Sequence, residues 1–120
     1  VAVLALGDFY DLGEKTVEAL SSTLGIEATL VKPYFASGVD QNLLDNLVKD
    51  HDVIVTIEDG IIEGGWGQNI ASYLGTSSAR VLNYGVKKAF YDRVNIADLM
   101  RENHLEPKLI AADIKQVLGM

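Results

Sequence analysis

The stretch "VTIEDGIIEGGWGQN", residues 55–69, is the part of the chain on which the interpretation of the fold depends. It opens with an apolar, β-branched run that is typical of a buried strand. Two carboxylates, Glu58 and Asp59, follow that run, and four glycines then occur between residues 60 and 67. Because glycine allows left-handed backbone and close packing, the pattern predicts a tight loop against a ligand, a catalytic centre or another protein surface.

Three more apolar runs of strand length occur along the chain. Their apolarity is continuous rather than alternating, which indicates strands covered on both faces, as in a parallel sheet. Together with the run described above, the predicted strands are residues 1–7, 26–33, 52–58 and 79–85. We expect the loops 7–12, 58–67 and 85–90 to meet at the carboxyl edge of this sheet, where ligands bind in such folds.

The segments between the strands have the apolar spacing of amphipathic helices. Asp40 is a suitable N-cap for one helix, and Pro107 fits the first turn of the last helix. A further helix carries Ile96, Leu99 and Met100 on one stripe. The order β-α-β-α-β-α-β-α-α indicates a single domain, residues 1–120, built as a three-layer α/β/α sandwich with a mainly parallel sheet.

The composition argues against several classes of partner. The net charge is −7 and no basic cluster is larger than Lys87–Lys88, which argues against a nucleic-acid or anionic-membrane surface. No apolar run approaches the roughly 20 residues of a membrane span. Cysteine is absent, which excludes disulfides and thiolate sites and fits a cytoplasmic location. Because Val1 lies inside a predicted strand, we expect the chain to be a piece of a longer polypeptide.

Two kinds of ligand site fit the residues at the carboxyl edge. The "GGWG" turn could offer backbone N–H groups to a phosphate, but neighbouring acidic residues would repel an anion, and close backbone packing explains the glycines as well. A carboxylate cluster could hold Mg²⁺ with a lysine nearby, as in receiver domains. The residues of that cluster are Asp8, Asp11, Glu58 and Asp59, with Lys87 or Lys88. Unlike in receivers, the carboxylate pair follows the third strand here.

Catalytic chemistry by the carboxylates or the histidines also has structural alternatives. Glu58 and Asp59 are adjacent in a strand and should point in different directions, so a capping or loop-fixing role for one of them is favoured over a paired acid and base. His51 follows a helix, where the dipole favours it, and His104 lies in a connector. Neither has a Ser or Cys partner at a diagnostic spacing. Trp66 either packs on its own domain or anchors a partner, where tryptophan is enriched.

The opening stretch resembles the carboxyl-terminal domain of transketolase-like thiamine diphosphate enzymes. Those domains carry a strand, then Glu-(Glu/Asp)-Gly, then Gly-Gly-x-Gly at the start of a helix. The matching residues here are Glu58, Asp59, Gly60, Gly64, Gly65 and Gly67. Within this superfamily the likeness is to the 1-deoxy-D-xylulose-5-phosphate synthase family. It covers essentially all 120 residues, including "VAVLALGDFY" (1–10) and "VLNYGVKKAFYDR" (81–93).

The chain departs from that family's pattern at three places. Tyr34 stands where the family usually has an arginine before the phenylalanine, here Phe35. Ser37–Gly38 stand where it usually has Lys-Pro, and Arg93–Val94 where it commonly has His-Gly. These differences leave the domain assignment intact, but they allow a diverged relative of the synthase.

The resemblance implies a parent enzyme that joins a two-carbon unit from pyruvate, with loss of CO₂, to glyceraldehyde 3-phosphate, in isoprenoid precursor synthesis. Thiamine diphosphate and Mg²⁺ would bind between the larger preceding domains of a homodimer. We therefore assign no catalytic, cofactor-binding or metal-binding residue to this domain. The resemblance also predicts four parallel strands in spatial order 2-1-3-4, without the family's first, antiparallel strand.

The resemblance further implies that the domain is inactive alone and contacts the preceding domains and the second subunit. The candidate interface loop is Glu58, Asp59, Gly60, Gly64, Gly65, Trp66 and Gly67. On this interpretation, Gly65→Val would weaken assembly of the parent more than folding of the domain. Two alternatives remain. One is a free-standing docking subunit of a split transketolase or 2-oxo acid dehydrogenase, and the other is a flavodoxin- or receiver-like module that binds its own ligand.

Overall fold

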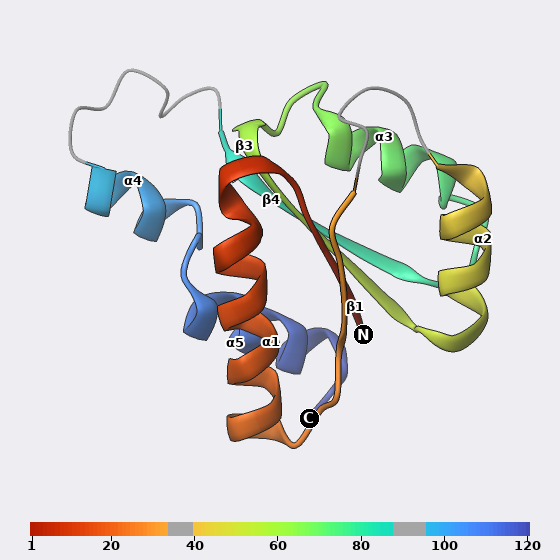
Figure 1. The fold of residues 1–120 in the computed structure, drawn as a ribbon, viewed down its shortest axis with the longest axis horizontal. Coiled ribbons are helices and arrows are strands. Elements are labelled where there is room, and N and C mark those ends of the chain that lie inside the picture. Colours follow the sequence, from red (N-terminus) through yellow and green to blue (C-terminus); the bar gives the residue numbers. More distant parts are fainter. Residues whose placement is uncertain (34–39, 88–95) are drawn as a thin grey trace.

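The computed structural model describes residues 1–33, 40–87 and 96–120, and these form a sheet between two helical layers (Figure 1). The strands are β1 (Ala2–Ala5), β2 (Thr29–Val31), β3 (Val53–Ile61) and β4 (Arg80–Val86). All pairings are parallel, and the spatial order is β2-β1-β3-β4. The predicted architecture and strand order are therefore confirmed.

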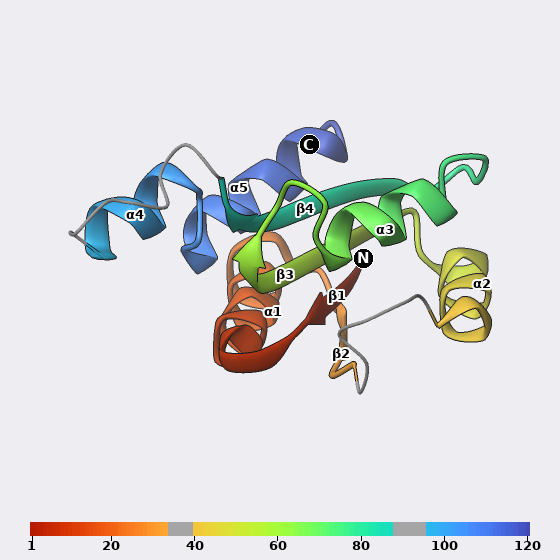
Figure 2. The same ribbon diagram turned by 90° about the horizontal axis from the view of Figure 1, so that it is seen from above.

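Helices cover both faces of the sheet (Figure 2). The 3₁₀ turn η1 (Gly7–Phe9) leads into α1 (Tyr10–Leu24), which shares one face with α5 (Pro107–Val117). The opposite face is covered by α2 (Gln41–Asp50) and α3 (Trp66–Tyr73). The short helix α4 (Ile96–Glu102) lies beyond the edge of this sandwich. No helix of the described ranges is long and apolar enough to cross a bilayer.

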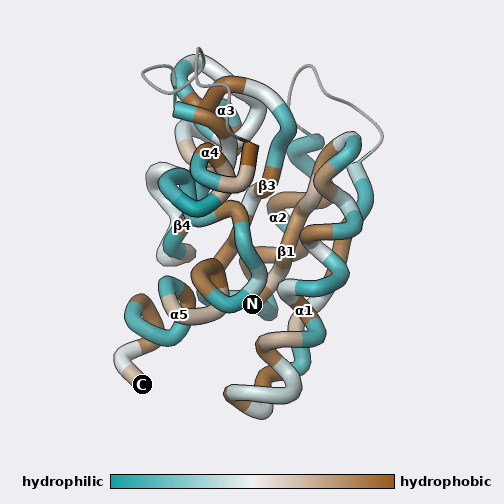
Figure 3. Tube along the Cα trace, turned by 90° about the vertical axis from the view of Figure 1, so that its left-hand side faces the viewer, coloured by the Kyte–Doolittle hydropathy of each residue, from teal (hydrophilic) through white to brown (hydrophobic). Residues whose placement is uncertain are grey.

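Each central strand contributes to two hydrophobic cores because successive side chains point to opposite faces. On β1, Val3 lies in the core beneath α1 and α5, whereas Leu4 lies in the core beneath α2 and α3. On β3, Val55 and Ile54 divide between the two cores in the same way. Figure 3 shows hydrophobic stretches along these strands in the middle of the molecule. Burial on both faces is the physical reason for their continuous apolar sequence.

Three sequence-based expectations need correction. Strand β3 does not end at Glu58 but continues to Ile61, with an irregular register between Ile57 and Ile61. Strand β2 is shorter than residues 26–33. Ile96 was expected on a packed helical stripe, yet its side chain is 73% exposed. The departures at Tyr34, Ser37, Gly38, Arg93 and Val94 lie outside the described residues, as do Phe35, Lys88 and Phe90.

The predicted cap of α2 is present. Asp40 has extended backbone, and its Oδ1 accepts the Leu43 N–H at 3.1 Å, which satisfies one of the donors that a helix start leaves without an internal partner.

We expect Asp40→Ala to lower the free energy of unfolding by about 1 kcal/mol, because this hydrogen bond is lost. Urea unfolding followed by circular dichroism measures the change. Asp50→Ala is the matched control, because Asp50 is an exposed carboxylate at the opposite end of α2, where the helix dipole does not favour it. An equal loss in both variants would contradict the cap assignment.

Candidate functional site

The candidate site is built around the Glu58 side chain, which reaches from β3 to the start of α3. Its Oε1 accepts the Trp66 N–H at 3.2 Å, and its Oε2 accepts the Gly67 N–H at 2.7 Å. Trp66 and Gly67 are the first two residues of α3, and the preceding Gly65 has no side chain to cap them. Glu58 therefore caps α3 from a neighbouring element, which confirms that one of the two adjacent carboxylates has a capping role.

Asp59 points the other way, as the strand geometry predicts. Its side chain is exposed, and its Oδ2 accepts the Asp8 N–H at 3.4 Å, which links β3 to η1. Gly85 on β4 also lies close, because a Cβ there would be 3.0 Å from the Gly60 carbonyl oxygen. The three predicted loops thus meet at the carboxyl edge, as far as they are described, but Glu58 and Asp59 do not form a carboxylate pair.

Burial decides the protonation behaviour of Glu58. The residue is only 5% exposed. Burial raises the pKa of the Glu58 carboxyl above its ordinary value, because the charged form loses hydration. The Gly67 and Trp66 N–H groups oppose this rise by stabilising the carboxylate, and the negative charge of Asp59 adds to it. The net direction is upward, so the two hydrogen bonds offset only part of the cost of burying the charge.

The glycines at 65 and 67 are required by close contacts inside the domain. A Cβ on Gly65 would clash with Glu58 Oε1 and would lie 2.5 Å from the Ile61 carbonyl oxygen. A Cβ on Gly67 would lie 2.5 Å from Thr56 Oγ1. Gly65→Val would therefore also disturb folding of the domain, because the added side chain would displace the capping carboxylate, whereas its effect on assembly of the parent stays a prediction.

The other two glycines of the loop have different roles. Gly64 adopts a left-handed φ of 73°, and its N–H donates to Gln68 Oε1 at 2.8 Å, which closes the turn before α3. Gly60 has room for a side chain, since the nearest atom to a Cβ there is 3.5 Å away. Three of the four glycines therefore meet separate local needs, and Gly60 does not.

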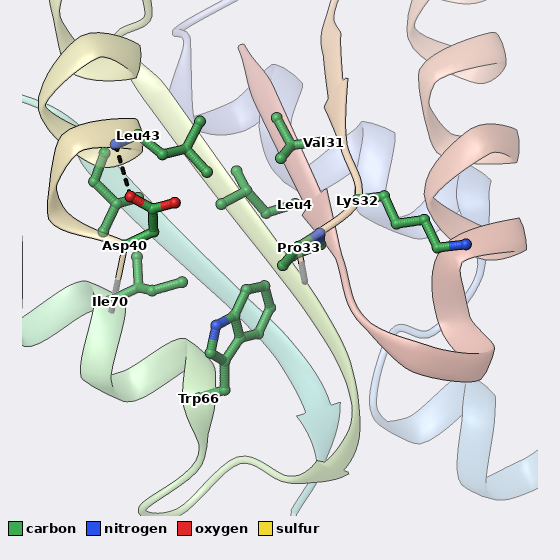
Figure 4. Close-up of a pocket in the computed structure, with 9 residues that line it drawn as sticks. Leu4, Val31, Lys32, Pro33, Asp40, Leu43, Trp66 and Ile70 are labelled. Atoms are coloured by element: carbon green, nitrogen blue, oxygen red, sulfur yellow. Dashed lines mark hydrogen bonds between the residues drawn. The ribbon is translucent and has the colours of Figure 1, made fainter. Parts of the chain in front are cut away.

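Trp66 packs on its own domain. Its side chain is 7% exposed and belongs to the core that also holds Leu4, Leu44 and Ile70. One side of the indole borders an apolar cavity of about 240 Å³ (Figure 4). The cavity is lined by Leu4, Val31, Lys32, Pro33, Asp40, Leu43, Leu44, Trp66 and Ile70. The packing alternative is thus confirmed for the indole ring.

The loop is a poor phosphate site, which overturns that candidate. The N–H groups of Trp66 and Gly67, which an anion would need, already bind Glu58. A phosphate would have to displace a buried carboxylate and would meet its negative charge. For the same reason, the diphosphate of thiamine diphosphate does not fit this turn.

The proposed Mg²⁺ cluster does not assemble. Glu58 is directed toward α3, and Asp11 pairs with Lys15 at 3.0 Å. Within residues 1–33, 40–87 and 96–120, no three His, Cys, Asp or Glu side chains are grouped so as to hold a metal ion. His51 is also accounted for, because Nδ1 lies 2.8 Å from the Leu47 carbonyl oxygen and Nε2 lies 2.8 Å from Thr29 Oγ1.

A hydrogen-bonded group that the sequence did not reveal joins three elements. Asp113 Oδ2 accepts the Tyr84 hydroxyl at 2.7 Å and lies 2.9 Å from His104 Nδ1. Burial, together with the hydrogen bond to Asp113, raises the pKa of Tyr84. His104 has a φ of 58°, the only positive value at a non-glycine residue in the described chain. The sequence contains no signal for this group, because a histidine in a connector does not by itself indicate a left-handed backbone.

We expect Gly65→Ala to lower the free energy of unfolding by about 1–3 kcal/mol, because the new methyl group overpacks the contact with Glu58 and Ile61. Gly60→Ala is the matched control in the same loop and should change it by less than about 1 kcal/mol. Thermal and urea unfolding of both variants measure the difference. Similar stabilities for the two would show that the close approach at Gly65 is unimportant.

We expect Glu58 to make stability depend on pH. Its folded pKa lies above the ordinary value of 4.5, so the folded state binds more protons between these two pKa values. The contribution of Glu58 is therefore fully present below pH 4.5 and declines as pH rises through the folded pKa. The unfolding free energy of the wild type minus that of Glu58→Gln should fall over this window. A difference that rises instead would mean that the N–H groups outweigh burial.

The comparisons with known proteins agree with this fold. Residues 1–110 match the family described as "Transketolase, C-terminal domain". A solved structure titled "Split gene transketolase, inactive beta4 tetramer" superposes with a TM-score of 0.84 at 23% identity, covering 98% of this chain and 39% of that one. This second likeness concerns the fold alone.

Curated relatives are 1-deoxy-D-xylulose-5-phosphate synthases. The protein of Colwellia psychrerythraea is 32% identical over 121 residues, covering 99% of this chain and 18% of the relative. That of Leifsonia xyli subsp. xyli is 35% identical over 123 residues, covering 99% and 18%. That of Pseudoalteromonas translucida is 39% identical over 92 residues, covering 75% and 14%. The chain thus spans less than a fifth of the length of these relatives.

With its parallel sheet, its Glu58-capped glycine loop and these matches, the chain belongs to the transketolase C-terminal domain family, in which it resembles the corresponding region of 1-deoxy-D-xylulose-5-phosphate synthases.

Proposed function

We propose that this chain is the carboxyl-terminal structural domain of a thiamine diphosphate-dependent 1-deoxy-D-xylulose-5-phosphate synthase. The parent would release CO₂ from pyruvate and transfer the remaining two carbons to glyceraldehyde 3-phosphate, in the cytoplasm. The observation that carries the proposal is sequence similarity along nearly the whole chain to such synthases. Thiamine diphosphate and Mg²⁺ would be held by the larger preceding domains of a homodimer.

The chemistry of the glycine loop supports a structural role. Its helix-start N–H groups are used internally by Glu58, and its indole is packed in the core. The Glu58 and Trp66 side chains are thus used to hold β3 and α3 together. The domain itself is proposed to be inactive and to contribute shape and contact surface to the parent.

The outer part of the loop is the proposed contact surface. Asp59, Gly60 and Gly64 are exposed, whereas Glu58, Gly65, Trp66 and Gly67 set the shape of the loop from beneath. We propose that a preceding domain or the second subunit lies against the exposed backbone. The outer edge of β2 has no partner strand among the described residues, so we also propose that it receives an antiparallel strand from the preceding polypeptide.

The test is CO₂ release from pyruvate by the full-length parent with thiamine diphosphate and Mg²⁺, with and without glyceraldehyde 3-phosphate. We expect acceptor-dependent release, its loss when the parent is cut just before Val1, and no release by residues 1–120 alone. The absence of acceptor-dependent release from the intact parent would overturn the synthase assignment. Restoration of activity by adding residues 1–120 as a separate chain would favour the docking-subunit alternative.

A further inference from the structure

The connector between α4 and α5 contains a histidine in a backbone conformation that usually belongs to glycine. His104 has a φ of 58°, and its N–H donates to the Arg101 carbonyl oxygen at 3.0 Å. The next residue, Leu105, donates its N–H to the Met100 carbonyl oxygen at 2.7 Å. This pair of bonds is a common way to end a helix, with glycine at the left-handed position. Because a Cβ is crowded there, a histidine at this position points to a use for the imidazole ring.

The imidazole is held by a carboxylate of α5. His104 Nδ1 lies 2.9 Å from Asp113 Oδ2, which also accepts the Tyr84 hydroxyl at 2.7 Å. A carboxylate only accepts hydrogen bonds, so the proton of the neutral ring must lie on Nδ1. Asp113 therefore fixes the tautomer and leaves the free electron pair on Nε2.

Nε2 of His104 is open to small molecules. The side chain is 50% exposed, and Nε2 has no hydrogen-bond partner in the part of the chain that the structure describes. The ring lines a cavity of about 280 Å³ beside β4. The charged side chains that line the same cavity are Lys87 and two carboxylates, Glu102 and Asp113. Because two negative charges face one positive charge, a neutral reagent suits this cavity better than an anion.

The other histidine of the chain lacks this arrangement. His51 Nδ1 lies 2.8 Å from the Leu47 carbonyl oxygen, and its Nε2 lies 2.8 Å from Thr29 Oγ1. Both ring nitrogens are therefore engaged, and an electrophile would first have to break one of these contacts. The structure thus separates one available imidazole from one that is occupied.

We propose that His104 is a modification site, at which Nε2 attacks neutral activated acyl compounds such as anhydrides and activated esters while Asp113 positions the ring. The electron pair of Nε2 forms a bond to the acyl carbon, and the bond from that carbon to the leaving oxygen breaks. The ring is then positively charged, and the nearby carboxylate stabilises this charge. Nδ1 finally loses its proton and the leaving group takes one up, so the product is a neutral acyl-imidazole.

The test is the reaction of the full-length parent with diethyl pyrocarbonate, a neutral anhydride, at about pH 8, where ordinary imidazoles are mostly neutral. Mass spectrometry of the peptides that contain His104 and His51 gives the two rates. We expect His104 to react about fivefold faster or more, because His51 must first lose a hydrogen bond.

Two substitutions separate positioning by Asp113 from mere exposure of the ring. Asp113→Asn keeps the acceptor oxygen and removes the charge. It should slow His104 by about fivefold, because a hydrogen bond to an ionised partner is roughly twice as strong as a neutral one. Asp8→Asn is the matched control, because it removes one exposed carboxylate elsewhere and should leave both rates unchanged. An unchanged rate at His51 shows that each variant remains folded.

Three results would overturn the proposal. One is a wild-type His51 that reacts as fast as His104, a comparison that needs no variant and holds even if Asp113→Asn does not fold. Another is an unchanged His104 rate in folded Asp113→Asn, because exposure alone would then explain the reaction. The third is an equal slowing by Asp8→Asn, which would reduce the effect to net charge. None of these outcomes depends on release of CO₂ by the parent, so the synthase assignment is tested separately.

Discussion

The contact between the Glu58 carboxylate and the first two N–H groups of α3 is the constraint that organises the carboxyl edge of this domain. It ties β3 to α3 at a helix start whose N-cap, Gly65, has no side chain, and it does so with a buried carboxylate. A buried carboxylate is tolerable only where donors replace its hydration, and the start of a helix supplies two such donors. The need for a glycine at position 65 follows in part from this contact, because a Cβ there would clash with Glu58 Oε1.

This arrangement explains why a loop with the composition of an anion site is a structural element. In a phosphate-binding turn, the helix-start N–H groups face a ligand. Here the protein's own side chain occupies them, and Thr56 Oγ1 donates to Asn83 Oδ1 at 2.6 Å directly beneath, closing the space between β3 and β4. The helix-start N–H groups and the Glu58 carboxylate therefore bind each other inside the domain, while exposed backbone and carboxylates face outward.

The second organising feature is the group around Asp113, which holds β4, α5 and the connector after α4 together. It fixes the end of the chain relative to the sheet and leaves α4 projecting from the body of the domain (Figure 1). The described residues thus leave exposed Asp59 beside the glycine loop and Ile96 at the start of α4.

The sequence by itself determined the fold class, the strand order through its family resemblance, the Asp40 cap and the capping role of one of the two adjacent carboxylates. Apart from the strand order, these features depend on local signals: continuous apolar runs, helical spacing, cap residues and the alternation of side chains along a strand. From the sequence, close backbone packing was one of two explanations for the glycines, and phosphate binding was the other.

Only the tertiary structure decided which residues each of these side chains contacts. Contacts between segments far apart in the chain determine that Glu58 is the carboxylate turned inward and that a side chain at position 65 would clash. They also determine that Ile96 is left in solvent and that Tyr84, Asp113 and His104 meet. No spacing of residues in the sequence predicts such contacts. The distance between two elements in space is set by how whole helices and strands pack, and not by their separation in the chain.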